Sequence, residues 1–86
     1  MVKGNISNGF NYSVDENKMD DMRFVDMLAS LEDKPVNIGK VAEFLLGKEQ
    51  KEKLYKHIEK DGKVSVEDFT EAFTEIMKDI PNGKKS

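Results

Sequence analysis

The turn at Asp61-Gly62 is the place where residue types and spacing most suggest a metal site. It lies between two helical patterns, and with Gly62 as the central glycine of an EF-hand loop, oxygen-bearing side chains fall at several ligand positions. That alignment also puts His57 at the first ligand position and Asp68 at the last. Calcium needs a hard oxygen at the first and usually a bidentate glutamate at the last. The sequence therefore favours a simple turn between two helices, without a metal.

Other candidates for chemistry are isolated side chains. His57 is the only histidine and the chain has no cysteine, so no second histidine or thiolate completes a transition-metal site. Asp20-Asp21 and Glu67-Asp68 are adjacent acids, but neighbours on a helix point about 100° apart and do not face one another. The sequence has no glycine-rich phosphate loop. It predicts neither an enzyme nor a bound cofactor.

Composition limits the class of protein and its partners. With 86 residues, 37% of them hydrophobic and 36% charged, residues 1–86 should form a single domain with one modest core. The net charge of −3 argues against a nucleic-acid partner, because phosphate binding needs a clustered excess of cations. The lysines of segment 48–60 alternate with glutamates and indicate a solvated helix face.

No apolar run approaches the ~20 residues that span a bilayer, and the N-terminus lacks a signal-peptide core. We therefore expect no membrane partner.

Residues 1–14 predict a β-hairpin. Asn8-Gly9 is typical of a tight type I′ turn, with strands over 3–7 and 10–14. A two-stranded ribbon is only marginally stable alone, so it should dock on the helices or on another chain. Its apolar face should carry Ile6, Phe10, Tyr12 and Val14.

Four helices should follow within 15–80, over about 16–31, 38–46, 49–60 and 66–80, before a flexible tail at 81–86. Asp15 is the expected cap of the first helix, with Ser13 and Glu16 as a rival capping box. Asn37 should cap the second helix, and Gly47 suits the left-handed residue that closes it. Ser65 should cap the fourth helix. The predicted fold is mainly α-helical.

The first and fourth helices carry broad apolar faces, whereas the third has only a thin stripe. A small domain whose other helices carry only narrow apolar stripes seldom buries such broad faces completely. Methionine-rich surfaces also adapt to varied partners. We therefore predict that apolar residues of these two helices bind protein. The predicted contact residues are Met19, Met22, Phe24, Met27, Leu28, Phe69, Phe73 and Met77.

The order of motifs is distinctive. A hairpin ending in Gly9-Phe10 and an acidic first turn come first, and Met22-Arg23-Phe24 then leads into Leu28. After a proline loop, Leu45-Leu46-Gly47-Lys48-Glu49-Gln50 runs on to Leu54-Tyr55, before the Gly62–Val64 turn into the last helix. This order resembles the small tail assembly chaperones of long-tailed (siphovirus-type) bacteriophages and prophages of Gram-positive bacteria.

The resemblance implies a non-enzymatic role in virion morphogenesis. Such chaperones bind and solubilise the tape measure protein in the cytoplasm of the bacterial host, and tail tube protein displaces them, so they are not expected in the mature virion. It also implies a homo-oligomer. Programmed ribosomal frameshifting is common in that family, so the resemblance further implies a minor longer product whose reading frame changes near Gly83, Lys84 and Lys85. An ordinary polar tail is the alternative interpretation of those residues. The alternative function is a small EF-hand-like but metal-free module that binds helices or regulates a partner.

Overall fold

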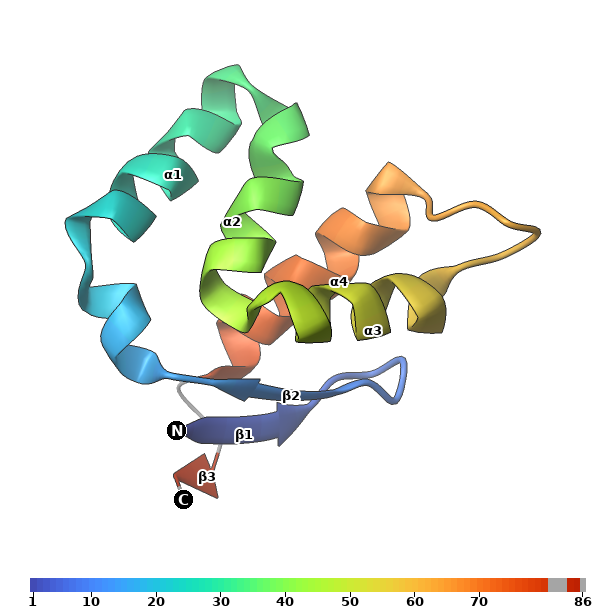
Figure 1. Cartoon of the computed structure of the whole chain (residues 1–86), viewed down its shortest axis with the longest axis horizontal. Coiled ribbons are helices and arrows are strands. Elements are labelled where there is room, and N and C mark those ends of the chain that lie inside the picture. Colours follow the sequence, from blue (N-terminus) through green and yellow to red (C-terminus); the bar gives the residue numbers. More distant parts are fainter. Residues whose placement is uncertain (81–83, 86) are drawn as a thin grey trace.

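The computed structural model describes residues 1–80 and 84–85 (Figure 1). It confirms a mainly helical fold, with four α-helices and an N-terminal antiparallel hairpin in the described part of the chain. Two 3-10 turns, η1 and η2, flank the first α-helix. The elements in order are β1 (Val2–Asn5), β2 (Asn11–Val14), η1 (Glu16–Asp20), α1 (Met22–Asp33), η2 (Pro35–Asn37), α2 (Ile38–Leu46), α3 (Lys48–Ile58), α4 (Val66–Asp79) and β3 (Lys84–Lys85).

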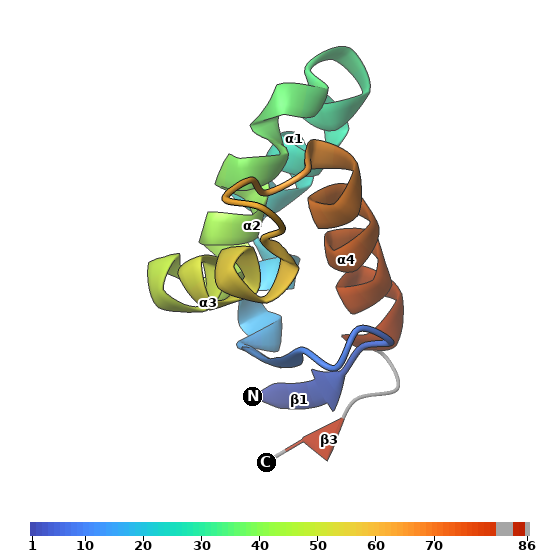
Figure 2. The same ribbon diagram turned by 90° about the vertical axis from the view of Figure 1, so that its right-hand side faces the viewer.

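Helix α2 is the centre of the molecule. It packs against α1, α3 and β2, while α4 packs against α3 and β1. Figures 1 and 2 show the sheet at one end of the molecule, and in Figure 1 α1 lies on one side of α2 with α3 and α4 on the other. The bounds of α2 match those predicted, and its core face, Val41, Ala42 and Leu45, is almost completely buried. Because this helix contacts both the sheet and the neighbouring helices, its apolar side chains join them into one core.

The hairpin forms, but its predicted type I′ turn is wrong. The Gly9 N–H donates to the Ile6 carbonyl at 2.9 Å, the Ile6 N–H donates to the Phe10 carbonyl at 3.1 Å, and Gly9 has φ +91°. The loop is therefore a three-residue turn with glycine at the positive-φ position. A two-residue turn at Asn8-Gly9 would place Ile6 opposite Asn11, on the other face from Phe10. The extra residue keeps the apolar side chains on one face, and the pairs are Val2–Val14, Gly4–Tyr12 and Asn5–Asn11.

The single helix predicted over 16–31 is divided at Asp21. Asp15, the predicted cap, accepts a hydrogen bond from the Asn17 N–H at 3.0 Å, but it caps only η1. Asp21 is extended, and its carboxylate caps α1 by accepting from the Arg23 N–H at 2.8 Å. The Arg23 side chain also donates to Asp21, and these hydrogen bonds lower the pKa of the Asp21 carboxyl. Two capping carboxylates therefore start two separate helical segments.

The other helix ends follow the predicted signals with one exception. Asn37 does not cap α2, because it is itself helical and its amide donates to the Ser30 hydroxyl at 3.4 Å. Gly47 has φ +85° as predicted, and α3 starts directly after it, at Lys48. The Ser65 hydroxyl accepts from the Asp68 N–H at 3.3 Å and caps α4 as predicted.

The side chain of Gln50, on α3, joins the sheet to the helices. Its carbonyl oxygen accepts from the Ser13 N–H at 2.8 Å, and its amide nitrogen donates to the Ser13 carbonyl at 2.6 Å. The same nitrogen donates to the Leu46 carbonyl at the end of α2, at 2.8 Å. The amide therefore satisfies both polar groups of one residue on the outer edge of β2, where an uncovered strand would be open to pairing.

A second polar link joins the sheet to α4. The Tyr12 hydroxyl donates to Asp79 Oδ2 at 2.8 Å, and the tyrosine side chain is 2% exposed. Tyr12 lies against its strand partner Gly4, where a Cβ atom would come within 2.6 Å of the ring atom Cε2. Gly4 is therefore required by close approach of the tyrosine ring.

The predicted flexible tail at 81–86 is only partly described. Lys84 and Lys85 form β3, which pairs antiparallel with Lys3 and Val2 of β1, so these two residues are not a free tail. Residues 81–83, including Gly83 of the predicted frameshift position, lie outside the described residues, as does Ser86. The sheet order is β2-β1-β3.

We predict that Gly4→Ala destabilises the protein by about 1–3 kcal/mol, because the added methyl group overpacks against Tyr12. Gly39→Ala is the matched control, since its Cβ would lie 3.6 Å from Tyr55 Oη, an ordinary contact. Alanine in the first turn of α2 should stabilise by up to about 1 kcal/mol. Urea denaturation of both variants tests this, and equal effects would contradict it.

We predict that stability falls above pH 10 because of Tyr12. Burial, with the hydrogen bond to Asp79 and its negative charge, raises the pKa of Tyr12 from 10.0 to about 12. The folded state thus holds this proton more tightly than the unfolded chain. The stabilisation that protonated Tyr12 gives to the folded state is complete below pH 10. It is lost as pH rises from 10 to 12, by at most about 1.4 kcal/mol per pH unit. Tyr12→Phe should lack this component, and denaturation midpoints of both proteins across that range measure the difference.

Candidate functional site

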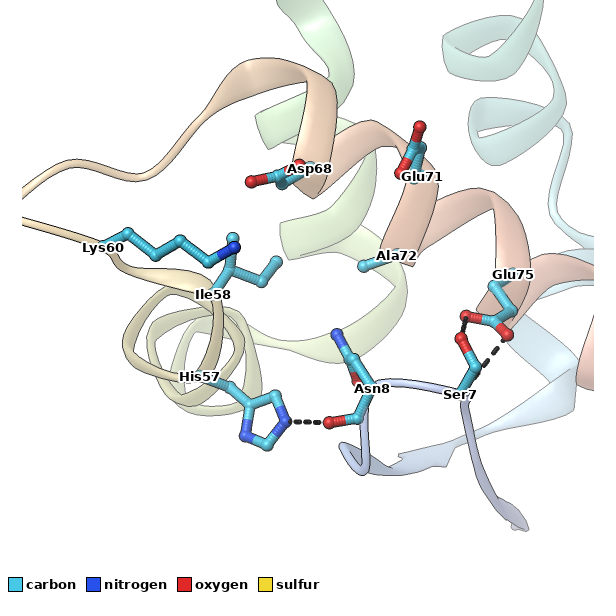
Figure 3. Close-up of a pocket in the computed structure, with 9 residues that line it drawn as sticks. All are labelled: Ser7, Asn8, His57, Ile58, Lys60, Asp68, Glu71, Ala72 and Glu75. Atoms are coloured by element: carbon cyan, nitrogen blue, oxygen red, sulfur yellow. Dashed lines mark hydrogen bonds between the residues drawn. The ribbon is translucent and has the colours of Figure 1, made fainter.

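A polar hollow lies where the hairpin tip meets the helices (Figure 3). It has a volume of about 260 Å³ and opens between the tip, the end of α3 and one side of α4. Polar and charged side chains dominate its lining. The lining residues are Ser7, Asn8, His57, Ile58, Lys60, Asp68, Glu71, Ala72 and Glu75.

The polar groups of this cleft hold the hairpin tip. The N–H and hydroxyl of Ser7 donate to the two carboxylate oxygens of Glu75 at 3.1 and 2.9 Å. His57 Nε2 lies 2.7 Å from the Asn8 carbonyl oxygen, an acceptor, so this ring nitrogen carries the proton. The His57 ring also contacts Phe10, with centroids 5.8 Å apart. His57 therefore anchors the tip, a role that the sequence did not indicate.

The cleft geometry bears on nucleophilic and metal chemistry. A serine nucleophile needs a base in hydrogen-bond contact that is itself oriented by a third group. Here Ser7 is bonded to Glu75 and His57 to the backbone of Asn8, so serine and histidine are bound to different partners (Figure 3). Among the described residues, no group of three or more His, Cys, Asp or Glu side chains is placed to hold a metal ion. What the cleft does is fix one end of the sheet against α3 and α4.

The Asp61-Gly62 segment is a tight turn. Asp61 has φ +52° and Gly62 φ +78°, and the backbone groups of Lys60 and Lys63 exchange hydrogen bonds of 2.9 and 3.0 Å. Two consecutive positive φ angles are typical of a type I′ turn. His57, at the first position of the EF-hand alignment, is directed to the hairpin tip. Sequence and structure agree on a short connection between α3 and α4.

The predicted protein-binding residues divide into three groups. Phe24, Phe69 and Phe73 are 1%, 3% and 2% exposed and lie in the core, which corrects the prediction of Phe24 and Phe73 as surface contacts, whereas Phe69 also lines a surface hollow. Met22 is 67% exposed on α1. The remaining four are half-buried against the core: Met19, Met27, Leu28 and Met77.

Two apolar surfaces remain accessible on the described residues. One, the α1 stripe, consists of Met22, Val25 and Ala29, which lie at i, i+3 and i+7 on the outer side of α1. The other, the valine groove, is a hollow of about 240 Å³ between η2, the start of α2, α3 and the start of α4. Its main lining residues are Val36, Ile38, Gly39, Tyr55, Val66 and Phe69.

Sequence reasoning missed most of these surface residues. Val25 was counted in the apolar face of its helix and Val66 in the regular stripe of the fourth, yet they are 45% and 68% exposed. Val36, at 84% exposed, follows Pro35 in a loop and carried no periodic signal. The position of Val66 directly after the cap Ser65 was the one available signal, because the first residue of a helix lies at the end of its packed face.

Comparison with known proteins adds no family assignment: no protein-family model, curated protein or solved structure matches this chain. Within the described residues, none of the helices has both the length and the apolar character needed to cross a bilayer.

We predict that Glu75→Ala loosens the hairpin tip, because Ser7 loses the acceptor for both its N–H and its hydroxyl. Amide hydrogen exchange at Ser7 should become faster, while exchange in α2 stays unchanged. Glu71→Ala is the matched control, since Glu71 lines the same cleft and makes no hydrogen bond to another described side chain. Equal acceleration in both variants would show that cleft charge, rather than the Ser7 contact, holds the tip.

Proposed function

We propose that the protein is a non-enzymatic tail assembly chaperone that binds and solubilises a phage tape measure protein. The proposal rests first on the sequence resemblance, whose central motif, 45–50, forms the junction of α2, α3 and the sheet. It rests second on the exposed apolar side chains. In the cleft, Ser7 is bonded to Glu75 and His57 to the Asn8 carbonyl, so serine and histidine do not form a catalytic pair.

The observation that carries the proposal is the grouping of these side chains. Single exposed apolar residues are normal on any protein and need no function. Here Met22 and Val25 lie together on one helix, and Val36 and Val66 both line one hollow. Surfaces of this kind accept the apolar face of a helix. A long helical tape measure protein presents many such faces.

Small contacts of this kind suit a chaperone that acts in many copies. Each contact is weak alone, but copies that bind side by side along one target gain strength from multivalency. Weak single contacts also allow tail tube protein to displace the copies one after another. The proposed place of action is the cytoplasm of the bacterial host, before the virion is complete.

The alternative, a metal-free helix-binding or regulatory module, is supported by the valine groove alone. A groove lined by Tyr55 and Phe69 is able to take one apolar side of a partner helix without any assembly. This alternative requires a monomer that binds one partner at a time.

We predict that co-expression with the tape measure gene of the same phage keeps the tape measure protein soluble and gives a complex that co-elutes with this chain. A variant with both Met22→Glu and Val36→Glu, which charges both apolar surfaces, should lower the soluble yield several-fold. Thr74→Glu, an exposed change on α4 outside both surfaces, is the control and should act like the natural protein. Insoluble tape measure protein and no complex with the unaltered chain would overturn the proposal.

A further inference from the structure

The α1 stripe is an apolar surface bordered by acids. Phe24, on the inner side of α1, stacks on Phe44 of α2 with ring centroids 6.0 Å apart, so the stripe faces away from α2. Three exposed acids border it: Asp26, Glu32 and Asp33. The only cation of α1, Arg23, is bonded to Asp21 at 3.0 Å. The stripe is therefore apolar along its centre and negative along its borders.

The valine groove has the opposite surroundings. Its floor is the edge-to-face pair of Tyr55 and Phe69, with centroids 5.2 Å apart. The Lys51 ammonium lies 5.5 Å from the centroid of the Tyr55 ring, beside the groove, and 3.6 Å from Glu43 Oε1. No acid lines the groove among the described residues, although the exposed Glu67 follows Val66 at the rim.

Two further lysines stand beside the groove. Lys40 and Lys63 are exposed and adjoin the lining residues Gly39 and Val64. Lys51 is paired with Glu43, so Lys40 and Lys63 against Glu67 leave the borders of the groove with a net positive charge. The groove is thus apolar like the α1 stripe, and the charge at its borders is of opposite sign. Such electrostatic complementarity guides the choice of partner.

From this match we propose that the α1 stripe of one copy docks in the valine groove of a second copy. A chain is unable to fill its own groove with its own stripe, because α2 lies between α1 and the α3–α4 side of the molecule (Figure 1). The contact is therefore head-to-tail. Each added copy leaves one stripe free at one end and one groove free at the other, so assembly continues until a ring closes or a filament grows.

This contact uses the same stripe and groove as the proposed tape measure contact, so the two compete for these surfaces, but docking between copies does not itself require the tape measure protein. Its test uses purified protein alone, so its outcome is separate from that of co-expression. Val25→Glu charges the stripe and Val66→Glu charges the groove rim, and both side chains are exposed enough for glutamate to be accommodated. Circular dichroism and thermal unfolding check that each variant keeps its fold.

We predict that the natural protein forms oligomers whose mass rises with concentration, and that each variant alone is monomeric. An equimolar mixture should give a 1:1 heterodimer, since Val25→Glu keeps its groove and Val66→Glu keeps its stripe. Sedimentation velocity or light scattering measures the masses. Two further single variants, Met22→Glu on the stripe and Val36→Glu in the groove, should behave in the same way alone and when mixed. Thr74→Glu should assemble like the natural protein.

Three results would overturn the inference. A natural protein that stays monomeric at high concentration lacks the contact. A mixture of the two variants that stays monomeric shows that stripe and groove do not bind each other. Assembly that survives in either variant alone, or is lost in Thr74→Glu, places the contact elsewhere on the molecule.

Discussion

The amide side chain of Gln50 is the interaction on which the arrangement of sheet and helices depends. It binds both backbone groups of Ser13 and the last carbonyl of α2, and so joins three elements through one residue. A hairpin of this size is marginal without such support. Gln50 reaches this position because Gly47, with its positive φ angle, lets α3 leave α2 without a loop. The motif 45–50 is thus one structural unit, in which leucines pack in the core, a glycine turns the chain and a glutamine forms hydrogen bonds with the edge of the sheet.

The other polar links follow the same plan. Tyr12 is bonded to Asp79, Ser7 to Glu75, and His57 to the backbone of the hairpin tip. Each link joins the N-terminal sheet to a helix at least 49 residues away in sequence. The apolar face of the hairpin supplies most of the burial, because the hydrophobic effect has no direction. The hydrogen bonds supply direction, and they fix where along α3 and α4 the sheet lies.

Local signals predicted the local structure well, and long-range contacts explain where they failed. The bounds of α2 and the cap at Ser65 depend on neighbouring residues and were predictable. At Asn8-Gly9 a local turn preference conflicted with the need to place Ile6 and Phe10 on one face, and burial decided the outcome. For Phe24 and Phe73, periodicity identified an apolar face but not what covers it, since a core and a partner select the same residues. The contacts of His57 and Gln50 were beyond prediction, because their partners lie 49 and 37 residues away.

The positions of the two tyrosines give the protein a built-in optical reporter. The chain has no tryptophan, so its near-ultraviolet emission comes from Tyr12 and Tyr55. Tyr12 is sealed beneath the sheet, whereas Tyr55 forms part of the groove wall beside Lys51. A ligand entering the groove changes the surroundings of one fluorophore and leaves the other untouched. Intrinsic fluorescence of the unlabelled chain therefore reads the occupancy of a single surface, without any added dye.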